Sequence, residues 1–203
     1  MISKDDITGV ILAGGEGRRV SGKDKGLLVY KGISLIKRQI DWLSPQVASL
    51  LISANRNIEN YQKYGHPVLL DQSNEVNNSS YGETEFNGPL SGILKALQSC
   101  STEWLFAQPV DVPNLPINLL DKILKTISRK PFESKNCYYL KSDQRDHYLS
   151  MLINKSAESQ LEQYLESDRR RVRDFHWTIN SQPVDLNLNE KLFENLNFEQ
   201  AYK

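Results

Sequence analysis

Residues 7–12 form a short apolar segment that runs directly into a glycine-rich, basic loop, and this junction limits the possible fold most strongly. The segment reads Ile-Thr-Gly-Val-Ile-Leu, which is typical of a buried strand. Five glycines follow between positions 14 and 26, together with lysines and arginines. Glycines after a strand let the backbone approach a ligand and turn its N–H groups toward phosphate oxygens. The junction therefore predicts a sheet with an anion-binding loop at a strand end.

Apolar runs then alternate with segments of helical periodicity. Further strands are expected at residues 47–53, 67–70, 104–107, 137–140 and 148–153. Helices are expected at residues 34–44, 58–64, 88–97, 117–128, 155–166 and 192–202. This alternation predicts an α/β fold with helices on both faces of a mostly parallel sheet. The polar stretch at residues 72–87 has no periodicity, and a loop of that length is expected to be a lid, a binding loop or disordered.

Composition excludes several classes of protein. The 203 residues suffice for one domain with a hydrophobic core, so residues 1–203 are predicted to form a single domain. Lys plus Arg (25) equals Asp plus Glu (25), which argues against a nucleic-acid-coating protein. Two cysteines without a CxxC motif argue against a disulfide scaffold or a cysteine zinc site. No apolar run approaches the roughly 20 residues that cross a bilayer, and the first residues lack signal-peptide features, so a cytoplasmic protein without a membrane partner is expected.

Two familiar phosphate-binding motifs nearly fit the glycine loop. The spacing from Gly17 through Gly22 to Lys23 is that of a Walker A motif, but Asp24 stands where a serine or threonine should meet magnesium. Gly15 and Gly17 begin a dinucleotide fingerprint that lacks its third glycine. Neither a P-loop NTPase nor an NAD enzyme is therefore supported.

The loop instead resembles the signature of nucleotidyltransferases that use nucleoside triphosphates, and within them the molybdenum cofactor guanylyltransferases (the MobA family). The segments that carry the likeness are Leu12-Ala13-Gly14-Gly15-x-Gly17-x-Arg19, Asp24-Lys25-Gly26-Leu27, Ala54-Asn55-Arg56, Asp71, Gly88-Pro89-Leu90-Ser91-Gly92, Pro109-Val110-Asp111-Val112-Pro113, Arg145-Asp146-His147 and Asn195-Leu196-Asn197. The sequence departs from the family pattern at Ser21, Ser53 and Val110, and in the length of its 72–87 segment.

The resemblance implies a three-layer αβα fold with a Rossmann-like, mostly parallel sheet of the nucleotide-diphospho-sugar transferase type. It also implies transfer of GMP from GTP to molybdenum-loaded molybdopterin, with release of pyrophosphate. The part up to about residue 130 would then bind the nucleotide, and the remainder would face the pterin acceptor. Apo-molybdoenzymes or other proteins of molybdenum cofactor biosynthesis are the further partners that it suggests.

The family motifs also imply a catalytic set. Asp111 follows a strand end, where open α/β sheets bind ligands, and is expected to hold Mg²⁺, which prefers oxygen ligands. The alternative for Asp111 is an ordinary Pro-Asp turn. Lys25 is expected to pair with the triphosphate, and Arg19 to bridge phosphates as charge moves to pyrophosphate.

A second set is expected to bind the nucleotide. Leu12, Ala13, Gly14 and Gly15 would offer backbone groups to guanine and ribose, together with Lys25, Asp71 and Asp111. The Asp71 carboxylate suits guanine N–H groups, the ribose or a metal, and its alternative is a helix N-cap. Asn55 is a weaker candidate for the same pocket.

Other features are less specific. His147 is expected to be structural or to face the pterin, because attack by a phosphate needs no general base. The arginines at positions 169, 170, 171 and 173 are expected to form a solvated helix face, with binding of a phosphate or a partner as the alternative. Two rival functions remain open at this stage, namely a nucleotidyltransferase for CTP or a sugar phosphate, and a non-catalytic module that delivers a finished cofactor.

Overall fold

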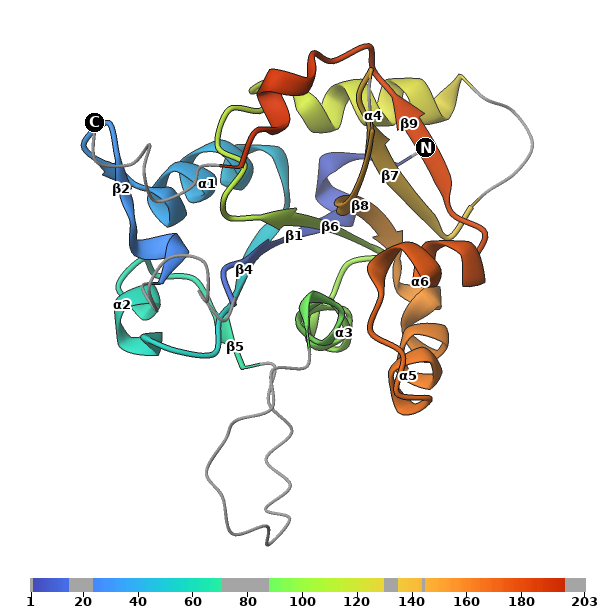
Figure 1. The fold of residues 1–203 in the computed structure, drawn as a ribbon, viewed down its shortest axis with the longest axis horizontal. Coiled ribbons are helices and arrows are strands. Elements are labelled where there is room, and N and C mark those ends of the chain that lie inside the picture. Colours follow the sequence, from blue (N-terminus) through green and yellow to red (C-terminus); the bar gives the residue numbers. More distant parts are fainter. Residues whose placement is uncertain (1, 15–23, 71–87, 130–134, 144, 196–203) are drawn as a thin grey trace, which may run out of the picture.

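A seven-stranded sheet forms the centre of the fold (Figure 1). The structure is a computed structural model that describes residues 2–14, 24–70, 88–129, 135–143 and 145–195. The strands, in chain order, are β1 (Ile7–Leu12), β4 (Ser49–Ser53), β5 (Val68–Leu69), β6 (Trp104–Pro109), β7 (Cys137–Lys141), β8 (Asp146–Asn154) and β9 (Gln182–Asp185). Their order across the sheet is β5-β4-β1-β6-β8-β7-β9. Strands β5, β4, β1 and β6 are parallel, whereas β8 runs antiparallel to both of its neighbours.

Helices cover both faces of this sheet. They are α1 (Leu35–Leu43), α2 (Ile58–Gln62), α3 (Pro89–Ser99), α4 (Leu119–Ser128), α5 (Glu158–Glu166) and α6 (Val172–Thr178). Alternate residues of β1 face opposite layers, because Ile7 and Ile11 pack in the core with α1 and α4, whereas Val10 packs with α3, α5 and α6 (Figure 1). The expected α/β fold with three layers and a mostly parallel sheet is thus confirmed.

Local signals in the sequence set several helix boundaries. The Ser34 hydroxyl accepts a hydrogen bond from the Lys37 N–H at the start of α1, and the helix ends before Pro45. Helix α3 begins after Gly88, whose φ of 76° favours glycine, and Pro89 occupies its first turn. These two helices lie where the sequence predicts them.

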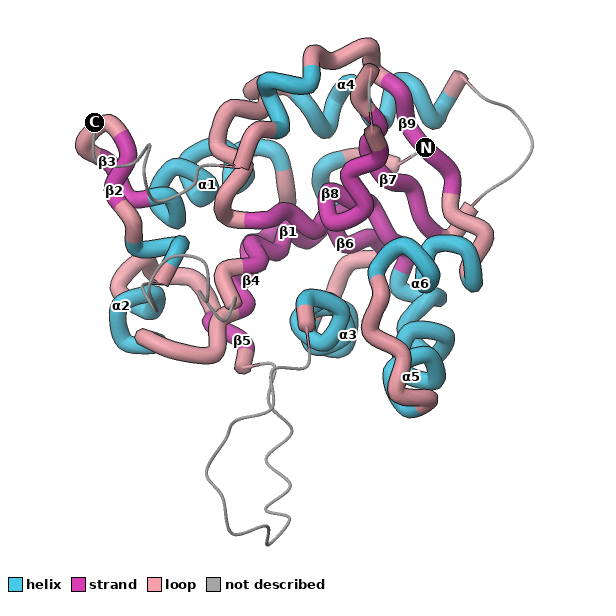
Figure 2. Tube along the Cα trace, viewed as in Figure 1, coloured by secondary structure: helices cyan, strands magenta, loops and turns pink. Residues whose placement is uncertain are grey.

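Several elements were not predicted from the sequence. Strands β2 (Val29–Tyr30) and β3 (Ile33–Ser34) form a separate hairpin, which lies apart from the main sheet (Figure 2). Helix α6 and strand β9 were also missed. The helix expected at residues 192–202 is not seen in the described part of that segment, where a 3-10 turn covers Glu190–Phe193.

Parallel pairing brings four strand ends to one edge of the sheet. Leu12 lies opposite Ser53 on one side and Pro109 on the other, and Ser53 lies opposite Leu69. The loops after β1, β4, β5 and β6 therefore leave from the same edge, where open α/β sheets bind their ligands. No helix within the described ranges is long and apolar enough to cross a membrane.

Candidate functional site

The loop after β1 is tied to the end of β4. The N–H groups of Ala13 and Gly14 both donate to the carbonyl of Ser53, at 2.8 and 3.0 Å. The Leu12 carbonyl in turn accepts from the Val110 N–H at 3.2 Å. These bonds fix the start of the glycine loop against both neighbouring strand ends. They also occupy two N–H groups that the sequence assigned to the nucleotide, so contacts from Ala13 and Gly14 would fall to their carbonyl groups.

Lys25 and Asp111 meet at this edge. The Lys25 ammonium Nζ donates to Asp111 Oδ2 at 2.9 Å, although 86 positions separate the two residues in the sequence. Lys25 belongs to the 3-10 turn Lys25–Leu27, and Asp111 lies two residues after β6. Their side chains are 26% and 15% exposed, so the pair is accessible to a ligand. The structure thus brings together the two charged residues that the sequence placed at the centre of the site.

Asp24 plays a different role from Asp111, although both are acidic residues beside Lys25. Its side chain is buried, and its oxygens accept hydrogen bonds from the Gly26 N–H (3.1 Å), the Asn57 amide (3.0 Å) and the Tyr61 hydroxyl (2.5 Å). Arg56 Nε lies 3.8 Å from Asp24 Oδ2. Because protein groups engage both oxygens, Asp24 is an anchor of the turn, and Asp111 is the acid that faces outward.

Helix α1 holds the loop that carries Asp111. The Gln39 side chain is 1% exposed, and its Nε2 donates to the Val112 carbonyl at 2.7 Å. Trp42 Nε1 donates to the Pro116 carbonyl at 2.9 Å. Val110 and Val112 are buried on either side of Asp111. The carboxylate therefore projects from a loop whose backbone is fixed by packing and by two side-chain hydrogen bonds.

The donor set at this edge suits a hard divalent cation that is shared with a ligand. The described part of the chain contains no group of three or more His, Cys, Asp or Glu side chains able to hold a metal. Mg²⁺ usually binds through one or two carboxylates together with substrate phosphates and waters. A single accessible carboxylate beside an ammonium group fits that mode, and it does not fit a structural metal site.

Some predicted site residues lie outside the described residues. They are Gly15, Arg19 and Asp71, together with the whole 72–87 segment. In the sequence, Asp71 comes two residues after Leu69, the last residue of β5. Asn55 lies within the loop after β4, at the same edge as Lys25 and Asp111.

His147 is held at the tip of the β7–β8 hairpin. Its Nε2 lies 3.0 Å from the Ser142 hydroxyl, and its ring stacks on Phe193 with centroids 3.6 Å apart. Glu190 accepts hydrogen bonds from Ser142 and Arg145. Burial lowers the pKa of His147, although the nearby Glu190 carboxylate opposes this effect. These contacts support the structural reading of His147, because they join the hairpin to the C-terminal segment.

The sequence predicts one helix face for the arginines at positions 169, 170, 171 and 173, but the structure does not place them on a single helix. Only Arg173 lies within α6, and Arg169 and Arg170 precede it in the turn after α5. The Arg169 guanidinium lies 4.3 Å from the centroid of the Tyr164 ring, and that of Arg173 lies 4.7 Å from the Trp177 ring. All four arginines are nevertheless exposed, as expected.

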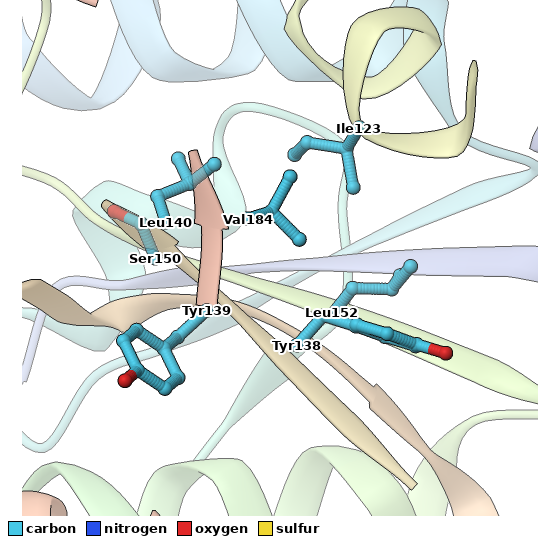
Figure 3. A pocket seen from close by; sticks show the side chains of 7 residues that line it. All are labelled: Ile123, Tyr138, Tyr139, Leu140, Ser150, Leu152 and Val184. Carbon is cyan, nitrogen blue, oxygen red and sulfur yellow. The ribbon is translucent and has the colours of Figure 1, made fainter. Parts of the chain in front are cut away.

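One gap in the core is too small to hold a ligand. The residues of Figure 3 surround it between α4 and strands β7, β8 and β9. Val184 lies near its centre, Ile123 reaches toward it from α4, and the Tyr139 ring points away (Figure 3). The gap has no room for a water molecule, so it is a packing feature and carries no binding function.

Sequence reasoning missed two supporting residues of the site. Tyr61 and Gln39 are both buried and contact Asp24 and the Asp111 loop respectively. Gln39 lies on the apolar face of an amphipathic helix, where a polar residue signals a buried hydrogen bond. Nothing in the local sequence marks Tyr61, which looks like an ordinary core aromatic residue.

Comparison with known proteins gives consistent matches over most of the chain. Residues 9–179 match the family described as the MobA-like NTP transferase domain. The molybdenum cofactor guanylyltransferase of Mannheimia succiniciproducens is 36% identical over 191 residues, which cover 94% of each chain. The protein of the same name from Cupriavidus metallidurans is 34% identical over 200 residues, which cover 97% of this chain and 93% of that one.

Solved structures show the same fold at lower sequence identity. Molybdopterin-guanine dinucleotide biosynthesis protein A from Archaeoglobus fulgidus superposes with a TM-score of 0.72 at 18% identity, covering 96% of this chain and 95% of that one. The bifunctional IspDF of Campylobacter jejuni gives a TM-score of 0.69 at 13% identity, covering 97% of this chain and 53% of that one.

Proposed function

This chain belongs to the MobA-like NTP transferase family, and on that basis we propose that it transfers GMP from GTP to molybdopterin that carries molybdenum. A phosphate oxygen of the acceptor attacks the α-phosphorus of GTP, and the bond between that phosphorus and the bridging oxygen breaks. Pyrophosphate leaves with the bonding electrons, and a new P–O–P linkage yields the guanine dinucleotide form of the cofactor. The observation that carries the proposal is the 2.9 Å contact between Lys25 Nζ and Asp111 Oδ2 at the shared strand edge.

The chemistry requires two anions to approach each other. The acceptor phosphate is already ionised, so no strong general base is needed, in keeping with the structural contacts of His147. The protein must orient the reactants and neutralise their charge, and orientation alone can lower a barrier by about 7–11 kcal/mol. Lys25 supplies a fixed ammonium to the triphosphate. Arg19 is proposed to neutralise charge as it moves to the leaving pyrophosphate.

Asp111 is the proposed metal ligand. Nucleotidyltransferases of this family need a divalent metal, and we propose Mg²⁺ because a lone carboxylate plus phosphate oxygens suits its coordination. When bound, the ion neutralises phosphate charge and orients the triphosphate. Asp111 would turn from Lys25 toward the ion, which leaves the ammonium free to contact the phosphates.

The nucleotide is proposed to lie across the ends of β1, β4 and β5. The carbonyl groups of Ala13 and Gly14, and the second lone pair of the Leu12 carbonyl, which already accepts from the Val110 N–H, are proposed acceptors for guanine and ribose donors. Gly15 and Asp71 are proposed to complete this pocket. The β7–β8 tip lies at the same edge, because Ala107 of β6 pairs with Met151 and the earlier part of β8 extends beyond it. We assign that side to the molybdopterin acceptor.

The proposal implies a supply of GTP and of loaded molybdopterin, which fits a cytoplasmic enzyme. Apo-molybdoenzymes, or other proteins that make the cofactor, are the proposed recipients and suppliers. The near balance of charge, 25 basic and 25 acidic residues, gives no support to a nucleic-acid partner.

Pyrophosphate release tests the proposal directly. The purified protein should release pyrophosphate from Mg-GTP when molybdenum-loaded molybdopterin is present. Lys25→Ala and Asp111→Ala should each lower the rate by about a hundredfold or more, because each removes a charge that acts on the phosphates. The matched control is the exposed Lys37–Asp41 pair on α1, where the same two alanine substitutions should leave the rate unchanged.

Full activity in both Lys25→Ala and Asp111→Ala would contradict the assigned site. Calorimetry with GTP, CTP and ATP tests the choice of base, and we expect GTP to bind most tightly. A clear preference for CTP would overturn the guanylyl assignment while preserving the reaction class. Absence of turnover together with binding of the finished cofactor would favour a delivery module.

A further inference from the structure

Tyr61 of α2 contacts the turn that carries Lys25 from the protein interior. The Tyr61 side chain is fully buried, and its hydroxyl donates to Asp24 Oδ1 at 2.5 Å. The same Asp24 oxygen accepts the Gly26 N–H at 3.1 Å. One buried phenol therefore holds the carboxylate that organises the backbone on both sides of Lys25.

Gly26 packs directly on the same ring. A Cβ atom added at Gly26 would lie 2.4 Å from the Tyr61 hydroxyl oxygen and 3.1 Å from its Cε1 carbon. Only glycine fits there without displacing the ring or the turn. Lys25 thus lies between two residues, Asp24 and Gly26, that both contact Tyr61.

The hydroxyl of Tyr61 is a permanent hydrogen-bond donor. Burial raises its pKa far above the ordinary value for tyrosine, and the neighbouring Asp24 carboxylate raises it further. The neutral phenol donates its only proton to Asp24, and Asn57 donates to the second carboxylate oxygen at 3.0 Å. The Asp24 charge is thereby compensated by fixed donors, as a buried carboxylate requires.

We infer that Tyr61 is a positioning residue for the proposed reaction, which fixes the Asp24–Lys25–Gly26 turn so that the Lys25 ammonium reaches Asp111. The inference rests on the proposed function and assigns to Tyr61 no contact with substrate. A fixed backbone sets where the Lys25 side chain begins, and a misplacement of about 1 Å can cost a hundredfold in rate.

A double-mutant cycle separates positioning from general support of the fold. Tyr61→Phe removes the hydroxyl and keeps the ring, and it is made both in the wild type and in Lys25→Ala. If Tyr61 acts through Lys25, Tyr61→Phe should weaken Mg-GTP binding by about tenfold when Lys25 is present, and by less than about twofold when it is absent. Calorimetry gives the four dissociation constants, and urea unfolding gives the four stabilities.

The matched control is Tyr64→Phe. Tyr64 follows α2 and hydrogen-bonds the Ser34 hydroxyl at 2.9 Å, so its loss removes a phenol contact without touching Asp24. It should leave Mg-GTP binding unchanged. Asp24→Asn provides a second route, because it keeps the side-chain size but removes the charge that Tyr61 and Asn57 compensate, and its effect should likewise depend on Lys25.

Equal losses of binding in the two backgrounds would overturn the inference, as would undiminished binding by Tyr61→Phe. If Tyr61→Phe does not fold, the Asp24→Asn cycle decides by the same criterion. A wild-type protein that binds Mg-GTP yet releases no pyrophosphate would overturn the proposed reaction and leave the cycle fully measurable. The two failures are therefore distinguishable.

Discussion

The parallel half of the sheet, β5, β4, β1 and β6, presents charged groups at its edge, whereas the half built around β8, β7 and β9 buries ionisable groups in neutral form. In the first half, the Lys25 and Asp111 side chains remain 26% and 15% exposed. In the second, His176 is 1% exposed and Cys137 is fully buried. Burial raises the pKa of the Cys137 thiol to about 12. The comparison indicates that the first half keeps a charged pair accessible to a ligand, whereas the core of the second half encloses His176 and Cys137 in uncharged form.

His176 shows how the second half uses a polar side chain. Its Nε2 lies 2.9 Å from the carbonyl of Tyr148, which can only accept, so Nε2 carries the proton. Nδ1 then accepts from the Ser181 hydroxyl at 2.9 Å. The neutral ring thus joins α6 to β8 and to the segment before β9. A protonated ring would place a charge in the core, and the Ser181 hydroxyl would then accept from Nδ1 instead of donating to it.

Acidification should therefore destabilise the protein through His176. Burial lowers the pKa of His176 from 6.5 to about 4, although the Tyr148 carbonyl and Asp146 oppose the shift. The stability that neutral His176 contributes is fully present above pH 6.5 and declines as the pH falls toward 4, because the unfolded chain binds the proton first. This pKa shift corresponds to about 3 kcal/mol of unfolding free energy. Urea unfolding at pH 7 and at pH 4 measures it against His176→Gln, which should lose less stability on acidification. Equal losses in the two proteins would show that His176 does not carry the effect.

A substitution at Gln39 should have a smaller effect, which acts through the loop that carries Asp111. Gln39→Leu removes the bond to the Val112 carbonyl and releases the loop that carries Asp111. Turnover should fall about tenfold, because a displaced carboxylate holds its ligand less well. The control is Gln46→Leu, since Gln46 bonds the Leu120 N–H and the Trp42 carbonyl but not that loop. A similar loss of turnover in both variants would remove the special role of Gln39.

Substitution of Glu190 should have the smallest effect, and it concerns the unfolding free energy. It accepts from Ser142 and Arg145, and burial, which raises its pKa, is outweighed by these hydrogen bonds, so that its pKa is lowered overall. Because the Arg145 side chain is 61% exposed, Glu190→Gln should cost less than about 1 kcal/mol in unfolding free energy. Asp168→Asn is the reference, since Asp168 is 95% exposed and its loss should have no measurable effect. A cost of several kcal/mol for Glu190→Gln would mean that the C-terminal segment contributes more than its contacts suggest.

The parallel half could be predicted from sequence in detail. The apolar run at residues 7–12 predicted β1, and apolar periodicity predicted α1 and α3. Lys25 and Asp111 could be named from the family motifs. Their contact could not, because it depends on the pairing of β1 with β6 and on the path of each loop. The functional roles of all the named residues stay predictions.

Strands β7 and β8 and helix α5 also lie where the sequence predicts them, whereas β9, α6 and the β2–β3 hairpin were missed for identifiable reasons. Strand β9 has four residues and contains Pro183, which removes a backbone donor and is tolerated there on the edge of the sheet. Helix α6 contains β-branched and aromatic residues, which have modest helix propensity, and tertiary packing of Phe175 and His176 stabilises it. The hairpin β2–β3 turns at Lys31 and Gly32, both with positive φ, in a segment too short for periodicity.

A crystal structure of the protein with Mg-GTP tests the central claim most directly. The account predicts the ion at about 2.1 Å from an Asp111 carboxylate oxygen, with the Lys25 ammonium within hydrogen-bonding distance of the triphosphate. The guanine should lie over the ends of β1, β4 and β5. A nucleotide bound at another face of the molecule, or a triphosphate that contacts neither Lys25 nor Asp111, would contradict the account.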